Sequence, residues 1–132
     1  MASAKGGSET EGRVTAPPEL SVIIPAYNGK ATIPLCLEAV VRATAGFSAE
    51  ILVVESSGDG TAAIVRTSFP GVQVIESSCR LTAGEARNRG IRSARGRWLF
   101  CVDQDCLVPP LWISGLLRHL DGEGVGAAGG SM

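Results

Sequence analysis

The sequence lacks several features that would place it in a common class of protein. Its net charge is only −1, so general binding to nucleic acid has no electrostatic support. No apolar run approaches the roughly 18 residues of a membrane-spanning helix, and the opening MASAKGGSETEGRV has no apolar core typical of a signal peptide. The four cysteines show no CxxC spacing and only one histidine is present, which argues against a zinc site and against a disulfide framework.

The composition indicates one globular domain. Apolar residues make up 45% of the 132 residues and charged residues 19%, which allows a real core. Residues 1–18 are small, polar and close with two prolines, so we expect a flexible tail there and a folded domain over residues 19–132. We expect reduced, mostly buried cysteines in a cytoplasmic protein; they are Cys36, Cys79, Cys101 and Cys106.

Short β-branched runs alternate along the chain with segments of helical periodicity. The predicted strands cover residues 20–25, 50–55, 72–76, 97–102 and 125–130. The predicted helices cover residues 31–44, 58–69, 82–95 and the segment from Pro109 to Leu120. Such alternation predicts an α/β fold with a mostly parallel, doubly wound sheet, whose ligands bind beyond the carboxyl ends of the strands.

Two of the predicted helices carry further signals. Thr82 and Glu85 have the spacing of a capping box at a helix start. A face of small and apolar residues should let this helix approach the sheet closely; it consists of Ala83, Ala86, Gly90, Ile91 and Ala94. The buried side of the last helix should be formed by Leu111, Trp112, Leu116, Leu117 and Leu120.

Two aspartates directly follow the apolar run WLFCV. Asp103 and Asp105 are two positions apart, so in an extended segment their carboxylates project to the same side. Their mutual repulsion is costly unless a cation lies between them, and hard carboxylate oxygens suit Mg²⁺ or Mn²⁺. The alternative is that the two acids simply end a strand in solvent.

Two more charged residues could contact a ligand. Six arginines fall within residues 80–97 against one acid, which favours a small anionic ligand. Among them, Arg87 follows small residues and could clamp a phosphate; the alternative is an ordinary solvated arginine. Glu55 ends the second strand before the loop SSGDGT, where a carboxylate could accept hydrogen bonds from a base or a ribose. Asp59 and Thr61 of that loop could instead cap the next helix.

Four segments occur together in a characteristic order. They are SVIIPAYNG at 21–29, ILVVESSGDGT at 51–61, AGEARNRGIRSARGRWLF at 83–100 and VDQDC at 102–106. Together they resemble the nucleotide-sugar-binding half of family 2 glycosyltransferases, which have the Rossmann-like GT-A fold. The resemblance covers about residues 20–130.

The resemblance implies roles for individual residues. The nucleotide pocket would be lined by Pro25, Ala26 and Tyr27. Glu55 stands where the family usually has an aspartate that touches the base, and Arg87 matches an arginine near the base and diphosphate. Asp105 would be a ligand of Mg²⁺ or Mn²⁺, and Asp103 would contact the ribose or the metal and its water. The metal would bridge the two phosphates of the donor.

The resemblance also implies a reaction. It would be an inverting transfer of a sugar from a nucleotide-diphosphate sugar, a UDP- or GDP-sugar, to a glycan, lipid or protein acceptor. The family's frequent VDDGSTDGT reads VESSGDGT here, which leaves the base open. No residue of this chain matches the family's catalytic base, so we expect a domain incomplete at its C-terminus that self-associates through an exposed sheet edge. Its location would be the cytoplasm or the cytoplasmic face of a membrane.

Two other classes of function compete with this interpretation. One is a non-catalytic nucleotide-sugar-binding module, or a truncated and inactive transferase fragment, which needs the acidic pair and Arg87 but no base. The other is a different doubly wound nucleotide enzyme. A dehydrogenase needs GxGxxG after the first strand, where this chain reads PAYNGKAT, and the glycine-rich, basic first loop of nucleotidyltransferases is absent as well.

Overall fold

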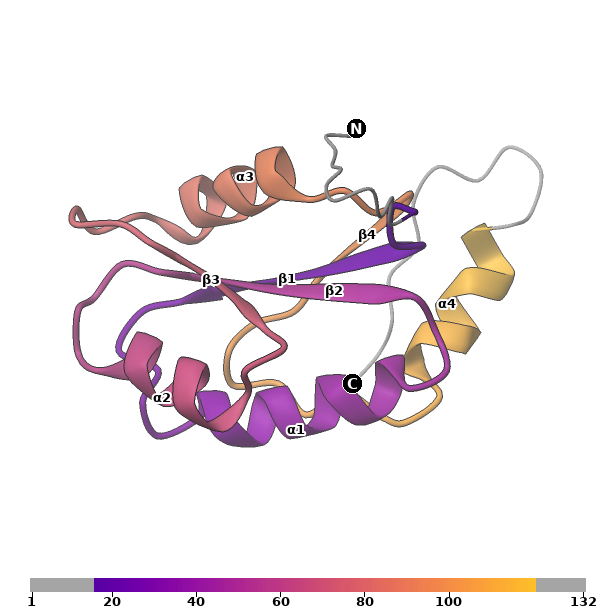
Figure 1. Cartoon of the computed structure of the whole chain (residues 1–132), viewed down its shortest axis with the longest axis horizontal. Coiled ribbons are helices and arrows are strands. Elements are labelled where there is room, and N and C mark those ends of the chain that lie inside the picture. Colours follow the sequence, from indigo (N-terminus) through magenta and orange to yellow (C-terminus); the bar gives the residue numbers. More distant parts are fainter. Residues whose placement is uncertain (1–15, 121–132) are drawn as a thin grey trace.

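The computed structural model describes residues 16–120, in which strands and helices alternate (Figure 1). The strands are β1 (Leu20–Ala26), β2 (Ala49–Glu55), β3 (Gln73–Glu76) and β4 (Trp98–Cys101). The helices are α1 (Ile33–Thr44), α2 (Thr61–Ser68), α3 (Ala83–Ser93) and α4 (Trp112–Leu120). The predicted order of elements is therefore confirmed over this range. The predicted strand at 125–130 and most of the predicted tail at 1–18 lie outside the described residues.

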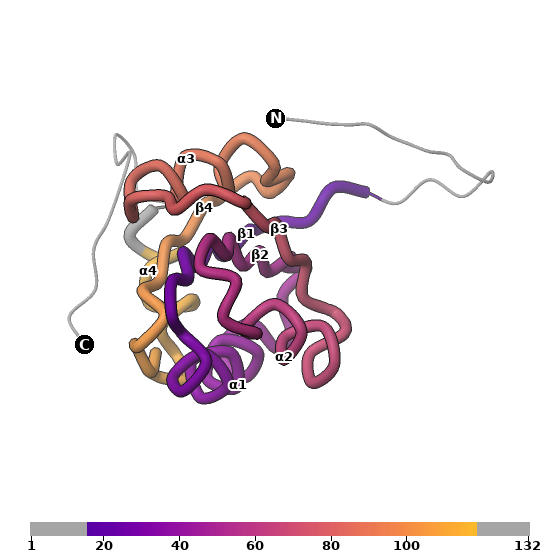
Figure 2. Tube along the Cα trace, turned by 90° about the vertical axis from the view of Figure 1, so that its left-hand side faces the viewer, coloured from indigo at the N-terminus to yellow at the C-terminus, as the bar shows by residue number. Residues whose placement is uncertain are grey.

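The four strands form one parallel sheet in the order β3-β2-β1-β4. The chain runs from β1 through β2 to β3 and then crosses back to place β4 on the other side of β1. Helices α1 and α2 cover one face of the sheet and α3 covers the other, which Figure 2 shows as three layers. The predicted doubly wound α/β fold is confirmed. The strand order reverses between β1 and β4, and such a reversal opens a crevice beyond the strand ends.

The two faces of the sheet carry cores of unequal size. The larger core lies between the sheet and helices α1 and α4, and it includes Leu20, Leu37 and Ile113, all fully buried. The smaller cluster, under α3, contains Ile23, Leu52 and Ala94. β1 contributes to both clusters because successive side chains of a strand point to opposite faces. Its continuous apolar sequence is typical of a parallel strand buried on both sides.

Helix α3 begins with the predicted capping box and lies close to the sheet. The Thr82 hydroxyl accepts a hydrogen bond from the Glu85 N–H at 3.1 Å, and the Glu85 carboxylate accepts one from the Thr82 N–H at 2.8 Å. A Cβ on Gly90 would lie 2.5 Å from Cγ2 of Ile23, so only glycine permits this approach. The predicted small-residue contact is confirmed at this position and at Ala86 and Ala94, which are buried.

Three of the residues predicted to be buried on helices are exposed instead. Ala83 lies in the first turn of α3, and Ile91, at 39% exposure, points off the buried side of that helix. Leu111 is 76% exposed because it precedes α4, which begins at Trp112 rather than at the two prolines. Trp112 instead contacts Phe100 edge-on, with ring centroids 5.4 Å apart, and this contact attaches α4 to β4.

The expectation of mostly buried cysteines is wrong. Cys36 alone of the four is buried, whereas Cys79 and Cys101 are exposed and Cys106 is half-buried; all four are free thiols. Cys101 is exposed because β4 is the last strand of the described sheet and α3 packs on β1 and β2 rather than on it. Within residues 16–120, no helix has both the length and the apolar character needed to cross a membrane.

Candidate functional site

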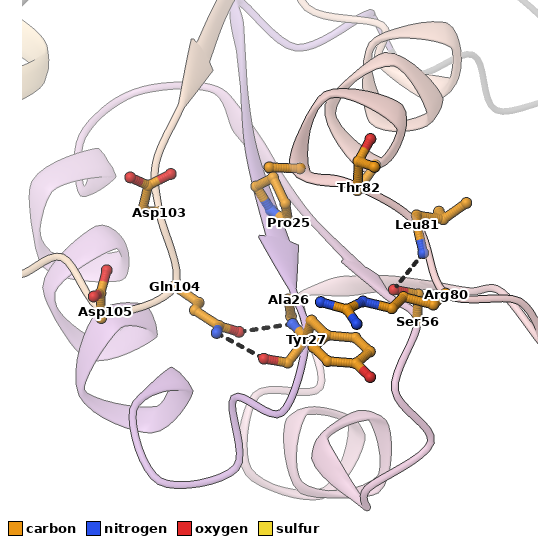
Figure 3. A pocket seen from close by; sticks show the side chains of 12 residues that line it. Pro25, Ala26, Tyr27, Ser56, Arg80, Leu81, Thr82, Asp103, Gln104 and Asp105 are labelled. Atoms are coloured by element: carbon orange, nitrogen blue, oxygen red, sulfur yellow. Dashed lines mark hydrogen bonds between the residues drawn. The ribbon is translucent and has the colours of Figure 1, made fainter.

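A pocket of about 300 Å³ opens at the carboxyl ends of the strands, where β1 and β4 part (Figure 3). Its walls come from the end of β1, the loop after β2, the start of α3 and the acidic segment after β4. These elements bring together Pro25, Ala26, Tyr27, Ser56, Arg80, Leu81, Thr82, Ala83, Ala86, Asp103, Gln104 and Asp105. The pocket therefore lies where the reversal of strand order predicts a ligand site.

One end of the pocket combines an aromatic ring with a positive charge. The guanidinium carbon of Arg80 lies 4.3 Å from the centroid of the Tyr27 ring, which is the geometry of a cation–π contact. Tyr27 follows the last residue of β1, and Arg80 lies in the loop between β3 and α3. In the same wall, Ser56 accepts a hydrogen bond from the Leu81 N–H at 3.1 Å and so joins the loops after β2 and β3.

The acidic segment forms the other end. Asp103 and Asp105 are exposed, and Figure 3 shows both on the segment that descends from β4, apart from Tyr27 and Arg80. Ligand atoms of these two residues and of Cys106 all lie within 4.8 Å of one another. Two carboxylates at such separation, open to solvent, are suitable ligands for a hard divalent cation that keeps some water in its coordination shell.

The structure does not bring Glu55 to the pocket wall. The residue is 1% exposed, and its carboxylate accepts hydrogen bonds from the Ser57 N–H at 2.8 Å, from the Gly58 N–H at 3.1 Å and from the Ser57 hydroxyl. Three donors of its own loop thus occupy the group that was predicted to contact a base. That contact stays a prediction.

The same loop contains a second hydrogen-bonded carboxylate. Asp59 accepts from the Thr61 hydroxyl at 2.5 Å and from the Thr61 N–H at 3.1 Å. The Ser57 oxygen lies 2.9 Å from Asp59, and its single hydroxyl proton is shared between Asp59 and Glu55. These bonds, led by that of the Thr61 hydroxyl, lower the pKa of Asp59 to about 2 even though partial burial acts in the opposite direction. Asp59 thus binds the N–H of Thr61, the first residue of α2, although the N-cap residue is Gly60 and has no side-chain cap hydrogen bond.

Arg87 likewise lies outside the pocket wall. It is half-buried on α3. Although Cys101 is exposed, partial desolvation by its surroundings raises the pKa of its thiol, and the nearby charge of Arg87 partly offsets that rise. The arginine that does line the pocket is Arg80, which precedes α3.

Comparison with known proteins gives the chain a family. The model of the family "Glycosyl transferase family 2" matches residues 21–132. The chain belongs to glycosyltransferase family 2. It is 35% identical over 120 residues to the glycosyltransferase AglE of Haloferax volcanii, an alignment that covers 87% of this chain and 40% of that protein.

Solved structures agree with this assignment and show the GT-A fold. The mannosyltransferase PcManGT of Pyrobaculum calidifontis, in complex with GDP-Man and Mn²⁺, superposes with a TM-score of 0.73 at 28% identity, over 85% of this chain and 35% of that one. Glucosyl-3-phosphoglycerate synthase of Mycobacterium tuberculosis, in complex with Mn²⁺, UDP and phosphoglyceric acid, gives 0.66 at 29% identity, over 82% and 41%. This family 2 chain spans 31% and 40% of the length of two curated relatives that it matches.

Sequence reasoning assigned five of the twelve pocket residues in this family 2 chain and missed the other seven, among them Arg80, Ser56 and Gln104. Arg80 belongs to a basic cluster of the sequence, but no periodicity connects it to Tyr27, 53 residues earlier. Ser56 stands next to Glu55, whose charge is the stronger signal in the sequence. Gln104 stands between the two aspartates, and its position there was the one available signal.

Proposed function

We propose that this chain forms the donor-binding half of a family 2 glycosyltransferase, which transfers a sugar from a UDP- or GDP-sugar to a glycan, lipid or protein acceptor with inversion. The observation that carries the proposal is the pocket where β1 and β4 part. It has an aromatic and cationic end at Tyr27 and Arg80 and an acidic end at Asp103 and Asp105. A nucleotide diphosphate has matching parts: a planar base and a diphosphate that needs a cation.

The pocket residues would divide the work of binding. The ring of Tyr27 would stack on the base, while Pro25 and Ala26, at the end of β1, would form the adjoining wall. Arg80 would contribute positive charge beside the nucleotide. In this proposal Glu55 shapes the loop that borders the base, and Arg87, which directly follows the pocket residue Ala86, contributes positive charge near the nucleotide.

The acidic end fits Mg²⁺ or Mn²⁺. Asp105 would be the metal ligand, and Asp103 would contact the ribose or a metal-bound water; their carboxylates are exposed and close enough to share one ion. When bound, the cation supplies positive charge that stabilises the departing nucleoside diphosphate. Two structural relatives were solved with Mn²⁺ and a GDP- or UDP-containing ligand, which supports this choice of ion and donor.

A second candidate is a nucleotide-sugar-binding module without catalysis, or an inactive transferase fragment. The described pocket favours it in one respect: apart from Asp103 and Asp105, no carboxylate or histidine lines the wall. No group in that wall would then be free to deprotonate an acceptor hydroxyl. We propose no catalytic base in this chain, and a cytoplasmic location, free or at the cytoplasmic face of a membrane, is part of the same proposal.

Titration calorimetry of the chain with UDP and with GDP, each with and without Mn²⁺, tests the proposal. We expect one nucleotide to bind only with the metal, and Asp105→Ala to abolish that heat. Glu38→Ala, which removes an exposed carboxylate on α1, serves as the control and should bind as the parent chain does. If neither nucleotide binds a folded sample in the presence of Mn²⁺, the proposed donor site is wrong.

A further inference from the structure

The side chain of Gln104, between the two aspartates, forms two hydrogen bonds to the backbone of Tyr27 (Figure 3). Its Oε1 accepts from the Tyr27 N–H at 2.9 Å, and its Nε2 donates to the Tyr27 carbonyl at 2.8 Å. One amide group thus pairs with both backbone groups of a residue 77 positions away in sequence. A glutamine side chain has a donor and an acceptor at the right spacing for this, and glutamate or asparagine would not reproduce both bonds.

These bonds lie where the two strands part. Along β1 and the segment after β4, the Val102 N–H still donates to the Ile23 carbonyl at 3.0 Å. Beyond that point the segments separate and the pocket opens between them. Gln104 spans the gap and supplies to Tyr27 the kind of hydrogen bonds that a neighbouring strand would have supplied. It therefore links the acidic end of the pocket to the aromatic end.

The Gln104 amide occupies space that is open only because Gly29 has no side chain. A Cβ on Gly29 would overlap Oε1 of Gln104 and lie 3.0 Å from its Cδ. Gly29 is not among the glycines with positive φ, so its backbone conformation is one that alanine adopts. What excludes a side chain here is therefore the Gln104 amide itself. Gly29→Ala would displace the amide while leaving the glutamine in the sequence.

We propose that Gln104 is a positioning residue that holds Tyr27 and the acidic pair at a fixed separation, so that one ligand contacts both. The inference rests on the proposed donor site and adds to it a residue that touches neither the base nor the cation. Free of this clamp, the loop of residues 27–32 moves relative to Asp103 and Asp105. The nucleotide and the metal would then have to order the loop on binding, which weakens their joint affinity.

Tyr27 is the single tyrosine of the chain, so it is a selective reporter. A sample labelled with ¹⁵N-tyrosine gives one backbone amide resonance. It comes from the Tyr27 N–H, which donates the hydrogen bond to Oε1 of Gln104. We expect Gln104→Ala and Gly29→Ala each to shift this resonance and to speed its hydrogen exchange. The matched controls are Asn88→Ala, an exposed amide on α3, and Gly71→Ala, where an added Cβ meets nothing within 4 Å; neither should change the resonance.

Calorimetry with Mn²⁺ and the nucleotide that binds the parent chain gives the functional measurement. Loss of two hydrogen bonds that preorganise the site should weaken metal-dependent binding about tenfold in either variant. The double variant should bind no more weakly than the single ones, because both substitutions remove the same clamp.

The outcomes separate this inference from the proposed function. If the parent chain binds but both variants bind equally well, Gln104 is not a positioning residue and the donor site stands. An unchanged Tyr27 resonance in Gly29→Ala would also overturn the inference. If the parent chain binds no nucleotide with Mn²⁺, the proposed function fails, and the inference fails with it.

Discussion

The two ends of the sheet both carry carboxylates, but their surroundings differ. At the amino ends of the strands, Glu50 is 7% exposed and accepts hydrogen bonds from the Ser21 hydroxyl at 2.6 Å, the Arg95 N–H at 2.5 Å and the Gln73 amide at 3.1 Å. At the carboxyl ends, Asp103 and Asp105 are exposed, and neither carboxylate receives a hydrogen bond or ion pair from the part of the chain that the structure describes.

This difference separates a structural carboxylate from one that is open to a ligand. Glu50 connects three segments, since Ser21 lies on β1, Gln73 begins β3 and Arg95 follows α3. Its charge is balanced by protein donors. The two aspartates repel each other with no protein donor to relieve them, which is a cost that a bound cation removes. Stability should therefore depend on Glu50 at the amino end, and on the buried Glu55 that ends β2, whereas binding should depend on the two exposed aspartates.

Removing Glu50 should have the largest effect on stability. Glu50→Ala leaves the buried Ser21 hydroxyl, the Gln73 amide and the Arg95 N–H without their acceptor, and we expect a loss of about 3 kcal/mol in the free energy of unfolding. Urea denaturation measures it, with Glu38→Ala as the exposed control. A loss equal to that of the control would mean that the network contributes nothing and that the comparison between the two ends fails.

Substitution of two glycines by alanine should show a difference in stability between the amino and carboxyl ends of the sheet. A Cβ on Gly96 would lie 2.6 Å from the backbone of Leu20 and Ser21, atoms that cannot move without distorting β1. We expect Gly96→Ala to cost about 2 kcal/mol of unfolding free energy. At Gly29 the obstacle is the flexible end of Gln104, so the same change should cost under about 1 kcal/mol. Equal losses in urea denaturation would show that the carboxyl end is as rigidly built as the amino end.

The sequence predicted the elements better than the contacts between them. Strand and helix order, the Thr82 capping box and the close approach at Gly90 follow from local periodicity and spacing, which a single sequence carries. The network of Glu50 does not, because a lone acid at the start of an apolar strand resembles a solvated strand end. Its donors come from segments 29 and 45 residues away.

The pocket shows the same limit. The position of Asp103 and Asp105 after an apolar strand identified the acidic end, but the strand order that puts it in one pocket with Tyr27 comes from the structure. The Arg80–Tyr27 stack and the Gln104 clamp depend on loop conformations that no periodic pattern encodes. Glu55 illustrates the converse: its residue type suggested a ligand contact, whereas its own loop occupies the carboxylate.

Acid should weaken the amino end first. Burial of Glu50 opposes its ionisation, but hydrogen bonds from Arg95, Ser21 and Gln73, together with the charge of Arg95, outweigh burial and hold its pKa below the usual 4.5. The stability from this lowered pKa is fully present above pH 4.5 and is lost as the pH falls through the folded-state pKa. Urea denaturation midpoints between pH 6 and pH 3, compared with those of Glu50→Gln, measure the contribution of the ionised Glu50 to the free energy of unfolding. This contribution cannot exceed the loss expected for Glu50→Ala. Parallel curves for the two chains would contradict it.

The smallest expected effect is that of Mg²⁺ on stability, and it tests the carboxyl end alone. At a Mg²⁺ concentration near its dissociation constant, binding to the folded state should add about 0.4 kcal/mol to the unfolding free energy. Asp105→Asn should abolish this gain, yet without metal it should unfold no more easily than the parent chain, because it removes a repulsion rather than a hydrogen bond. Thermal unfolding with and without Mg²⁺ measures both quantities. If the variant is less stable than the parent chain without metal, Asp105 stabilises the fold as Glu50 does. The distinction between a structural carboxylate and one that is open to a ligand would then fail.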